Sequence, residues 1–351
     1  MVKIKRLLAA EICRPLRATF STSLGAKNII RSVLVKIILT DGASGLGEIP
    51  TSFSLKHETI PVIKHILKNV SPQFINSPIN DYEAKIAGLR EKFFKYPMTI
   101  SGLEVALFRA YLKNRDITEH VYWGAKSINL ETDITIPFIV NDISLKDWMN
   151  YILSKNFKTY KLKVSGKLSL DKKILASVYS ALKNKLNKFV LRLDGNQGYT
   201  QATFLKMLDF IEKNNYRIQL FEQPLKKNDY KGLKFIKKHS TIPIILDETI
   251  FTNKSLEYAI EHDLADGVNI KIAKSGISES AKIIRTAKKH NLKLMIGCMT
   301  ETMTGLSAGI YLSSGTGMFD FIDLDSVYFL HYTNRYDNIL IKDSGFIIKT
   351  S

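Results

Sequence analysis

The feature that most constrains the fold is a regular alternation of short apolar runs with longer helical patterns from about residue 133 onward. Such alternation is typical of β-then-α units that build a parallel sheet. Eight units in succession predict a (β/α) barrel over residues 126–325. Because no full helix follows the last apolar run, we expect the (β/α)7β-like variant of this barrel. The eight expected strands are Ile134–Val140, Thr159–Val164, Phe189–Asp194, Ile218–Glu222, Ile242–Leu246, Gly267–Ile272, Leu292–Gly297 and Phe319–Asp325.

The first 125 residues lack this alternation and predict a separate α+β domain. The last residues, 326–351, carry two strand-like pieces, Val327–His331 and Ile339–Lys349, which we expect to return to that domain. The elements expected in the first domain are strands at Ile4–Glu11 and Ile30–Leu39, a polar loop at Ser21–Asn28 between them, an Asp41-Gly42 turn, and helices at about 58–69, 80–94 and 99–113.

Three acids end three consecutive predicted barrel strands: Asp194, Glu222 and Asp247. Catalytic groups of such barrels lie at the C-terminal ends of the strands, and adjacent strands are about 4.8 Å apart, so the three side chains can converge on one ion. Hard oxygen ligands suit Mg²⁺, and no histidine or sulfur of the set indicates zinc. A single acid here could be a helix N-cap, but three in succession favour one Mg²⁺ per subunit.

Two lysines, Lys163 and Lys271, lie on the second and sixth predicted strands and therefore on opposite sides of an eight-stranded barrel. This arrangement suits 1,1-proton transfer, in which one base removes an α-proton and the opposite conjugate acid returns it. Lys161, on the same strand face as Lys163, is a cation that would lower its pKa. Proton loss beside a carboxylate builds an enediolate, whose charge a divalent cation stabilises.

Composition narrows the class of protein further. The net charge is +18, but the lysines are scattered and no nucleic-acid motif is present, so we expect neither nucleic-acid nor membrane binding. Only two cysteines occur, which excludes a disulfide framework and favours the cytoplasm. The apolar stretch near the N-terminus is cut short by Glu11, which argues against a secretory signal.

The order KLK, DGN, EQP, DE and KIAK, with GCMTET and DLD near the end, resembles the enolase superfamily, and most closely its muconate-lactonizing-enzyme subgroup. The resemblance covers nearly the whole chain and implies a capping domain with two mobile specificity loops near residues 17–28 and 50–58. It implies Asp194, Glu222 and Asp247 as Mg²⁺ ligands, Lys163 and Lys271 as bases for the (R)- and (S)-faces, Lys161 on the substrate carboxylate, and Asn196 and Glu248 behind the ligands.

The pair Asp323 and Asp325 discriminates among the reactions of this subgroup. Residues i and i+2 of a strand share a face, and two carboxylates there suit an ammonium group with three donors. The pair resembles that of the dipeptide epimerases, which implies a small dipeptide substrate, an L-Ala-D/L-Glu epimerase activity and murein-peptide metabolism in cell-wall recycling. Thr135 and Cys298, with Met299 and Glu301, are expected to line the pocket by the same resemblance. The alternative interpretation of the pair is an ordinary acidic strand end or helix-capping acids, but the other five residues of the set favour the ammonium role.

One departure concerns the substrate side chain. The Ala-Glu epimerases carry an arginine in the first capping loop, where this chain has Gly25. A side-chain carboxylate would then need Lys27, Arg17 or Lys56, or the enzyme would have apolar or broad specificity. The remaining alternatives are an N-acylamino acid racemase, an o-succinylbenzoate synthase, and a basic binding protein without turnover. The sequence leaves a homo-oligomer open.

Overall fold

The computed structural model describes residues 1–138, 142–331 and 335–349. Eight parallel strands form one barrel-like sheet in the order β5 to β12, as the sequence predicted. The first expected strand, Ile134–Val140, is shorter in the structure, and its last two residues lie outside the described part. The strands are β5 (Ile134–Ile136), β6 (Thr159–Lys163), β7 (Val190–Asp194), β8 (Ile218–Glu222), β9 (Ile244–Leu246), β10 (Gly267–Ile270), β11 (Lys293–Gly297) and β12 (Phe321–Asp323).

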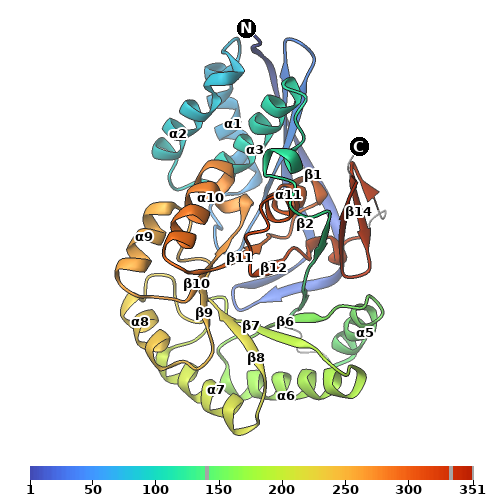
Figure 1. Cartoon of the computed structure of the whole chain (residues 1–351), viewed down its shortest axis with the longest axis vertical. Helices are drawn as coiled ribbons and strands as arrows, with labels where there is room; N and C mark the ends of the chain where they lie inside the picture. Colours follow the sequence, from blue (N-terminus) through green and yellow to red (C-terminus); the bar gives the residue numbers. More distant parts are fainter. Residues whose placement is uncertain (139–141, 332–334, 350–351) are drawn as a thin grey trace.

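A helix follows each barrel strand except the last, and these helices surround the sheet (Figure 1). Thr200 and Thr252 begin two of them with capping boxes, in which a threonine accepts from the backbone three residues on. Only the short 3-10 helix η2 (Ser326–Phe329) follows β12, so the (β/α)7β prediction is confirmed. The helices are α5 (Asp142–Leu153), α6 (Leu168–Lys185), α7 (Gln201–Lys213), α8 (Tyr230–His239), α9 (Asn253–Glu261), α10 (Ile272–Lys289) and α11 (Met303–Thr316).

The N-terminal part packs a three-stranded antiparallel sheet against helices above the barrel (Figure 1). Gly45 and Gly47 of β3 lie directly on α3, where a Cβ at Gly45 would approach the Cβ of Arg109 to 2.8 Å. The close approach explains the many contacts between this strand and helix. The elements are β1 (Ile4–Thr22), β2 (Gly25–Leu39), β3 (Ser44–Pro50), α1 (Ile60–Phe74), η1 (Ile79–Asp81), α2 (Tyr82–Lys92), α3 (Pro97–Asn114) and α4 (Glu119–Tyr122).

The hairpin formed by β1 and β2 is longer than predicted. The expected polar loop Ser21–Asn28 is wrong, because pairing continues to Thr22 and Gly25 and leaves only a tight turn. The extra length places the turn against the barrel, where the Ser23 hydroxyl donates to the Asn196 carbonyl at 2.7 Å. Figure 1 shows this hairpin descending from the N-terminal part toward the barrel.

Three buried glutamates tie the N-terminal part together and to the barrel. Glu48 accepts from the amides of Thr302 and Gly305 at the start of α11, at 3.0 and 3.1 Å. Glu104 accepts from the amides of residues 277 and 278, where α10 resumes after a kink, both at 2.9 Å. Glu58 accepts from the amides that begin α3. Carboxylates at helix N-termini satisfy free amides and the helix dipole, so these contacts dock the two parts.

The C-terminal residues form a small separate sheet. β13 (Arg335–Tyr336), β14 (Ile339–Lys342) and β15 (Gly345–Ile348) add to β4 (Asn129–Glu131) in the order β13-β14-β15-β4. The strand expected at Val327–His331 is wrong: most of it is the 3-10 helix, and Leu330 alone bridges to Leu16 of β1. In the described part of the chain, no helix combines the length and apolar character that a membrane crossing requires.

Candidate active site

The three predicted metal ligands come together at one end of the barrel. Asp194 and Glu222 are the last residues of β7 and β8 and lie opposite each other in register, and Asp247 directly follows β9. Their exposed fractions are 0, 0 and 3%. Burial and the neighbouring Asp194 carboxylate raise the pKa of Glu222, against the effect of the lysines around it. Three adjacent buried carboxylates need cations to balance them.

Four lysine ammonium groups surround these acids. Lys163 contacts Asp194 at 2.5 Å, and Lys161 lies 3.4 Å from Glu222. Asp247 binds both Lys271, at 2.8 Å, and Lys274, at 2.6 Å. Burial would raise the pKa of Asp247, but Lys271 and Lys274 outweigh it and hold this pKa well below its ordinary value. Lys163 ends β6 and Lys271 follows β10, and these strands are four apart in the sheet, so the two lysines face the centre from opposite sides.

The donor set fits a Mg²⁺ ion. Its oxygens are carboxylates from three consecutive strands, with no sulfur or imidazole among them. Within the described ranges, Asn196 Oδ1 and Glu248 Oε2 are buried beside these acids with no hydrogen-bond partner. Burial, then the Asp247 and Asp194 carboxylates, raise the pKa of Glu248 to about 8. Asp194, Glu222 and Asp247 would hold the ion.

Residues outside the sequence prediction position this set. Asn269, buried in β10, donates to Glu222 Oε1 at 2.7 Å. Gly297 ends β11 where a Cβ would stand 2.6 Å from Asn269 Oδ1 and 2.8 Å from Lys271 Cε, so only glycine leaves room for both. Gln223 follows Glu222 with a φ of 33° and accepts from the Asp247 amide at 2.9 Å. A polar residue in the middle of a predicted barrel strand was the signal that could have revealed Asn269.

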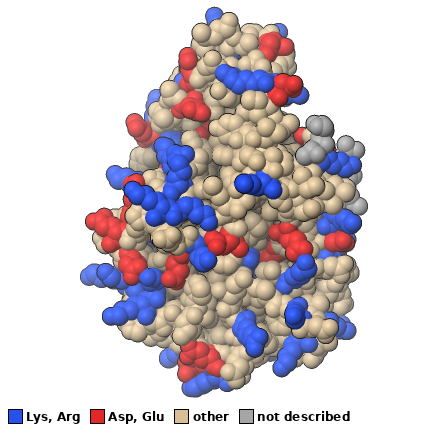
Figure 2. Space-filling view, in the orientation of Figure 1, with Lys and Arg blue, Asp and Glu red and all other residues tan. Residues whose placement is uncertain are grey.

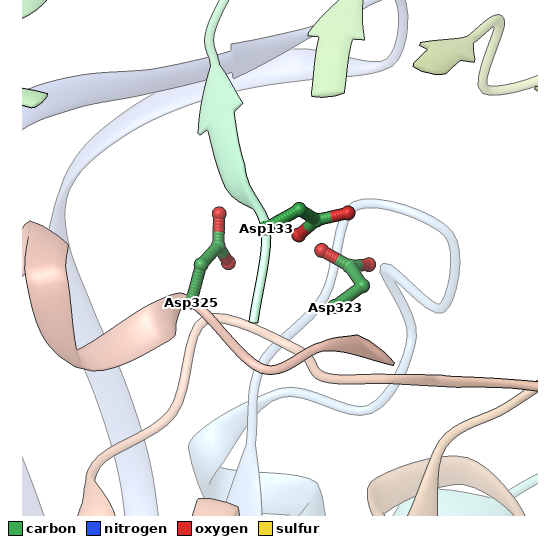
Figure 3. Close-up of side chains that lie close together, drawn as sticks. All are labelled: Asp133, Asp323 and Asp325. Atoms are coloured by element: carbon green, nitrogen blue, oxygen red, sulfur yellow. The ribbon is translucent and has the colours of Figure 1, made fainter. Parts of the chain in front are cut away.

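A second group of acids lies where the barrel closes between β12 and β5 (Figure 3). Carboxylate oxygens of Asp133, Asp323 and Asp325 lie within 4.8 Å of one another. Lys161 binds Asp323, Arg192 binds Asp133 at 2.6 Å, and the Thr135 amide donates to Asp325 at 2.6 Å. Asp133, which the sequence prediction missed, has a pKa raised well above its ordinary value by burial and by Asp323. The carboxylates of Asp133 and Asp323 point toward each other in Figure 3.

Members of both acid groups, namely Asp247, Asp323 and Asp325, line one cleft with an empty volume of about 750 Å³, including its open mouth, whereas Asp194, Glu222 and Asp133 are not among its lining residues. The barrel side holds both predicted bases, Lys161, Asp323 and Asp325, and Thr135 and Cys298 lie there as expected. Cys298 Sγ is 3.8 Å from Asp325, and burial raises the pKa of this thiol. The opposite wall comes from the N-terminal part, namely Phe20, Thr22, Leu24, Lys27 and Thr51 to Ser54.

The structure distinguishes the three cations that were expected as partners of a substrate side-chain carboxylate. Lys27 lines the cleft. Arg17 instead lies 4.7 Å above the Tyr151 ring, and Lys56 is exposed. On the face of the molecule shown in Figure 2, lysines and arginines are interspersed with acids. This distribution agrees with a small-molecule site in the cleft.

A (β/α)7β barrel with three acids between opposed lysines, below an N-terminal α+β part, defines an enzyme of the enolase superfamily. The chain belongs to the enolase C-terminal domain-like family, whose model matches residues 145–347. The L-Ala-D/L-Glu epimerase of Francisella tularensis subsp. novicida (strain U112) is 30% identical over 357 residues, which are 98% of each chain. The chain is therefore an isomerase that groups with epimerases.

Two further relatives refine this position. The aromatic dipeptide epimerase of Herpetosiphon aurantiacus is 29% identical over 93% of this chain and 91% of that protein. The substrate-liganded structure of the L-Ala-D/L-Glu epimerase from Bacillus subtilis is 26% identical and covers 99% of this chain and 96% of its own, with a TM-score of 0.91. Because these relatives are about equally similar yet differ in named substrate, overall similarity does not decide the side chain that this site accepts.

Proposed function

We propose that this chain is a Mg²⁺-dependent dipeptide epimerase that inverts the α-carbon of the C-terminal residue, with L-Ala-D/L-Glu as its substrate. The alternative is a dipeptide epimerase of apolar or broad specificity. The observation that carries the proposal is the placement of Lys163 and Lys271, which line one cleft from opposite sides. A binding protein would have no need for two opposed bases. A preference for L-Ala-D/L-Glu would fit murein-peptide metabolism in the cytoplasm.

The two lysines would exchange a proton across the α-carbon. The neutral lysine on one side accepts the α-proton, and the ammonium on the other side donates a proton to the opposite face. In the structure, burial lowers the pKa of Lys271, but Asp247 and Glu222 outweigh it and raise this pKa well above its ordinary value. Those two acids are proposed ligands, so neutralising their charge would lower the pKa of Lys271 toward the range of a general base.

Asp194, Glu222 and Asp247 would hold the Mg²⁺ ion, with Asn196 and Glu248 beside them. When bound, this ion supplies positive charge to the substrate carboxylate as the α-proton leaves. Lys161 lies between Glu222 and Asp323, 3.4 Å from the former, and would bind the same carboxylate. Burial of the acids and lysines keeps water from competing for these contacts.

Asp323 and Asp325 would bind the substrate ammonium group. Both line the cleft, and Asp323 Oδ1 has no partner within the described ranges. A free dipeptide places its ammonium group one residue from the reacting carbon, which matches a site on the wall beside the base pair. An N-acylated amino acid has no such group, so this wall favours a dipeptide over the substrate of an N-acylamino acid racemase.

The test is an epimerisation assay on the purified protein with Mg²⁺. L-Ala-L-Glu, apolar dipeptides and N-succinyl amino acids are incubated separately. Growth of the second diastereomer of a dipeptide is followed by proton NMR, and racemisation of an N-succinyl amino acid is followed by the loss of its optical rotation. We expect L-Ala-D-Glu to appear with Mg²⁺ and not with excess EDTA. Conversion of the N-succinyl compounds alone would refute the dipeptide proposal, and turnover restricted to apolar dipeptides would refute the glutamate preference.

A further inference from the structure

The wall of the cleft that comes from the N-terminal part carries one lysine, and within the described ranges this lysine forms no ion pair with a carboxylate. Lys27, near the start of β2, donates to the Thr51 carbonyl at 3.3 Å and lies over the Phe53 ring at 5.6 Å. Within the described ranges it has no ion pair, whereas the four other lysines of the cleft each lie within 4.0 Å of a carboxylate. A cation in this position is available to a bound anion.

The local backbone directs Lys27 into the cleft. Gly25 and Lys27 are two residues apart on β2 and therefore share a face. At Gly25 a Cβ would stand 3.0 Å from two carbons of the Phe53 ring, so this ring occupies the space above the glycine. Lys27 is then the first side chain on this face that reaches past the ring into the cleft, and no cation can extend from position 25 without moving Phe53.

The charge of Lys27 is maintained near neutral pH. Burial lowers the pKa of Lys27 to about 8, with Glu301 and Glu48 acting in the opposite direction, so most molecules carry the ammonium form at pH 7. Glu48 is occupied by the amides that begin α11. Burial and Glu48 raise the pKa of Glu301 to about 8, so Glu301 is mostly uncharged at pH 7. Within the described ranges, neither acid forms an ion pair with Lys27, and both favour its charged form.

We propose that Lys27 binds the side-chain carboxylate of the residue that is epimerised and so selects dipeptides that end in an acidic residue. The proposal rests on the proposed function, which orients the reacting carbon. If its proton lies between Lys163 and Lys271, its carboxylate faces the Mg²⁺ ion and Lys161, and its nitrogen points toward Asp323, the carbon has one direction left for its side chain. That direction leads to the wall from the N-terminal part, where Lys27 lies.

The experiment compares Lys27→Met with Lys56→Met, which removes an exposed lysine of a neighbouring loop outside the cleft. Initial rates are measured on L-Ala-L-Glu and on its uncharged isostere L-Ala-L-Gln. We expect Lys27→Met to lower kcat/KM for L-Ala-L-Glu by about 30-fold or more, chiefly through KM, because a buried charged partner is lost. Turnover of L-Ala-L-Gln should change less than about threefold. Lys27→Arg should keep the preference for glutamate, and Lys56→Met should match the wild type on both substrates.

Equal losses on both dipeptides, or no loss on L-Ala-L-Glu, would overturn the role of Lys27 while leaving the dipeptide epimerase intact. A wild-type enzyme that prefers L-Ala-L-Gln would overturn it as well. Inactivity of the wild type on every dipeptide would instead refute the proposed function, and this inference with it. Turnover of L-Ala-L-Gln by Lys27→Met shows that the variant is folded, so a loss on glutamate alone is specific.

Discussion

Two neighbouring groups of three acids both contribute to the cleft but differ in the cations around them. Asp194, Glu222 and Asp247 are surrounded by four lysines, two of which bind Asp247. The second group, Asp133, Asp323 and Asp325, has only Lys161 and Arg192 as cationic partners in the described part of the chain. In that group, oxygens of Asp133 and Asp323 remain without hydrogen bonds.

The comparison shows that the charged and polar groups around a carboxylate, rather than its residue type, determine what the carboxylate can bind or do. The acids of the first group lie among lysines whose pKa values depend on the charge of these acids. Such a site suits a reaction in which a proton is transferred. The second group keeps acceptor capacity that its own cations do not use, which suits a ligand with several N–H donors. Variants that affect one group and spare the other test this division.

The largest effect is expected for the first group. Glu222→Gln removes a ligand charge and leaves Lys161 and Lys271 less balanced, so turnover should fall by about 10³-fold or more. Isothermal titration calorimetry should show Mg²⁺ affinity reduced at least about tenfold. Glu91→Gln, at an exposed position, is the matched control and should behave as the wild type. Unchanged Mg²⁺ binding in Glu222→Gln would contradict the assignment of this group.

A smaller and different effect is expected for the second group. Asp323→Asn should lower kcat/KM for a free dipeptide by about 30-fold, since an ammonium would lose a buried charged partner. The wild type should discriminate against an N-acetylated dipeptide, and the variant should lose most of this discrimination. Mg²⁺ affinity should stay the same. Asp209→Asn, in an exposed pair with Lys213, is the control; a variant that discriminates as the wild type does would remove the ammonium role.

Glu48 shows what an acid outside both groups does. Its carboxylate accepts from Thr302 and Gly305 at the start of α11, so Glu48→Gln should lower the free energy of unfolding by about 1–2 kcal/mol. Urea denaturation measures this loss. Kinetic constants of the folded variant should change little compared with Asp323→Asn. No loss of stability would show that docking of the N-terminal part does not depend on this helix cap.

The last expected effect is a pH dependence of stability. The pKa of Glu301 in the folded protein is about 8, against 4.5 for an ordinary glutamate, because burial and then Glu48 raise it. Between these values the folded state keeps a proton that the unfolded chain releases, so this group's contribution to stability is lost as pH rises from about 4.5 to about 8. Glu301→Gln removes that dependence. When melting temperatures are measured at pH 5.5, 7 and 8.5, the difference between the variant and the wild type should change in favour of the variant as pH rises. If the two proteins show parallel dependences on pH, the raised pKa of Glu301 is excluded.

The sequence was sufficient to predict the barrel and its acids and lysines, because each lies at the end of an apolar run. The β1–β2 hairpin was only half found, because Pro15 interrupts β1 and the pairing shifts register between Pro15 and Phe20. The apolar run at Val327–His331 looked like a strand but forms a 3-10 turn, in which the Tyr328 amide donates to the Asp325 carbonyl. Short apolar runs do not distinguish these states.

The residues missed in the site share one property: their partners are distant in sequence. Asp133 binds Arg192 across the inside of the barrel, and Glu48 and Glu104 cap helices more than 170 residues away. No local pattern identifies such pairs. Lys27 was one of three candidates from the sequence, and only the fold distinguishes it from Arg17 and Lys56 by placing it in the cleft.

The most direct test of the two-base account follows α-proton exchange in D₂O with Mg²⁺, starting separately from L-Ala-L-Glu and L-Ala-D-Glu. The wild type should exchange both compounds and interconvert them. Lys163→Ala should exchange only the L,L compound through Lys271, Lys271→Ala should exchange only the L,D compound through Lys163, and neither variant should form the other epimer. If either variant still interconverts the two, or if each variant exchanges both, the account of two opposed lysines is wrong.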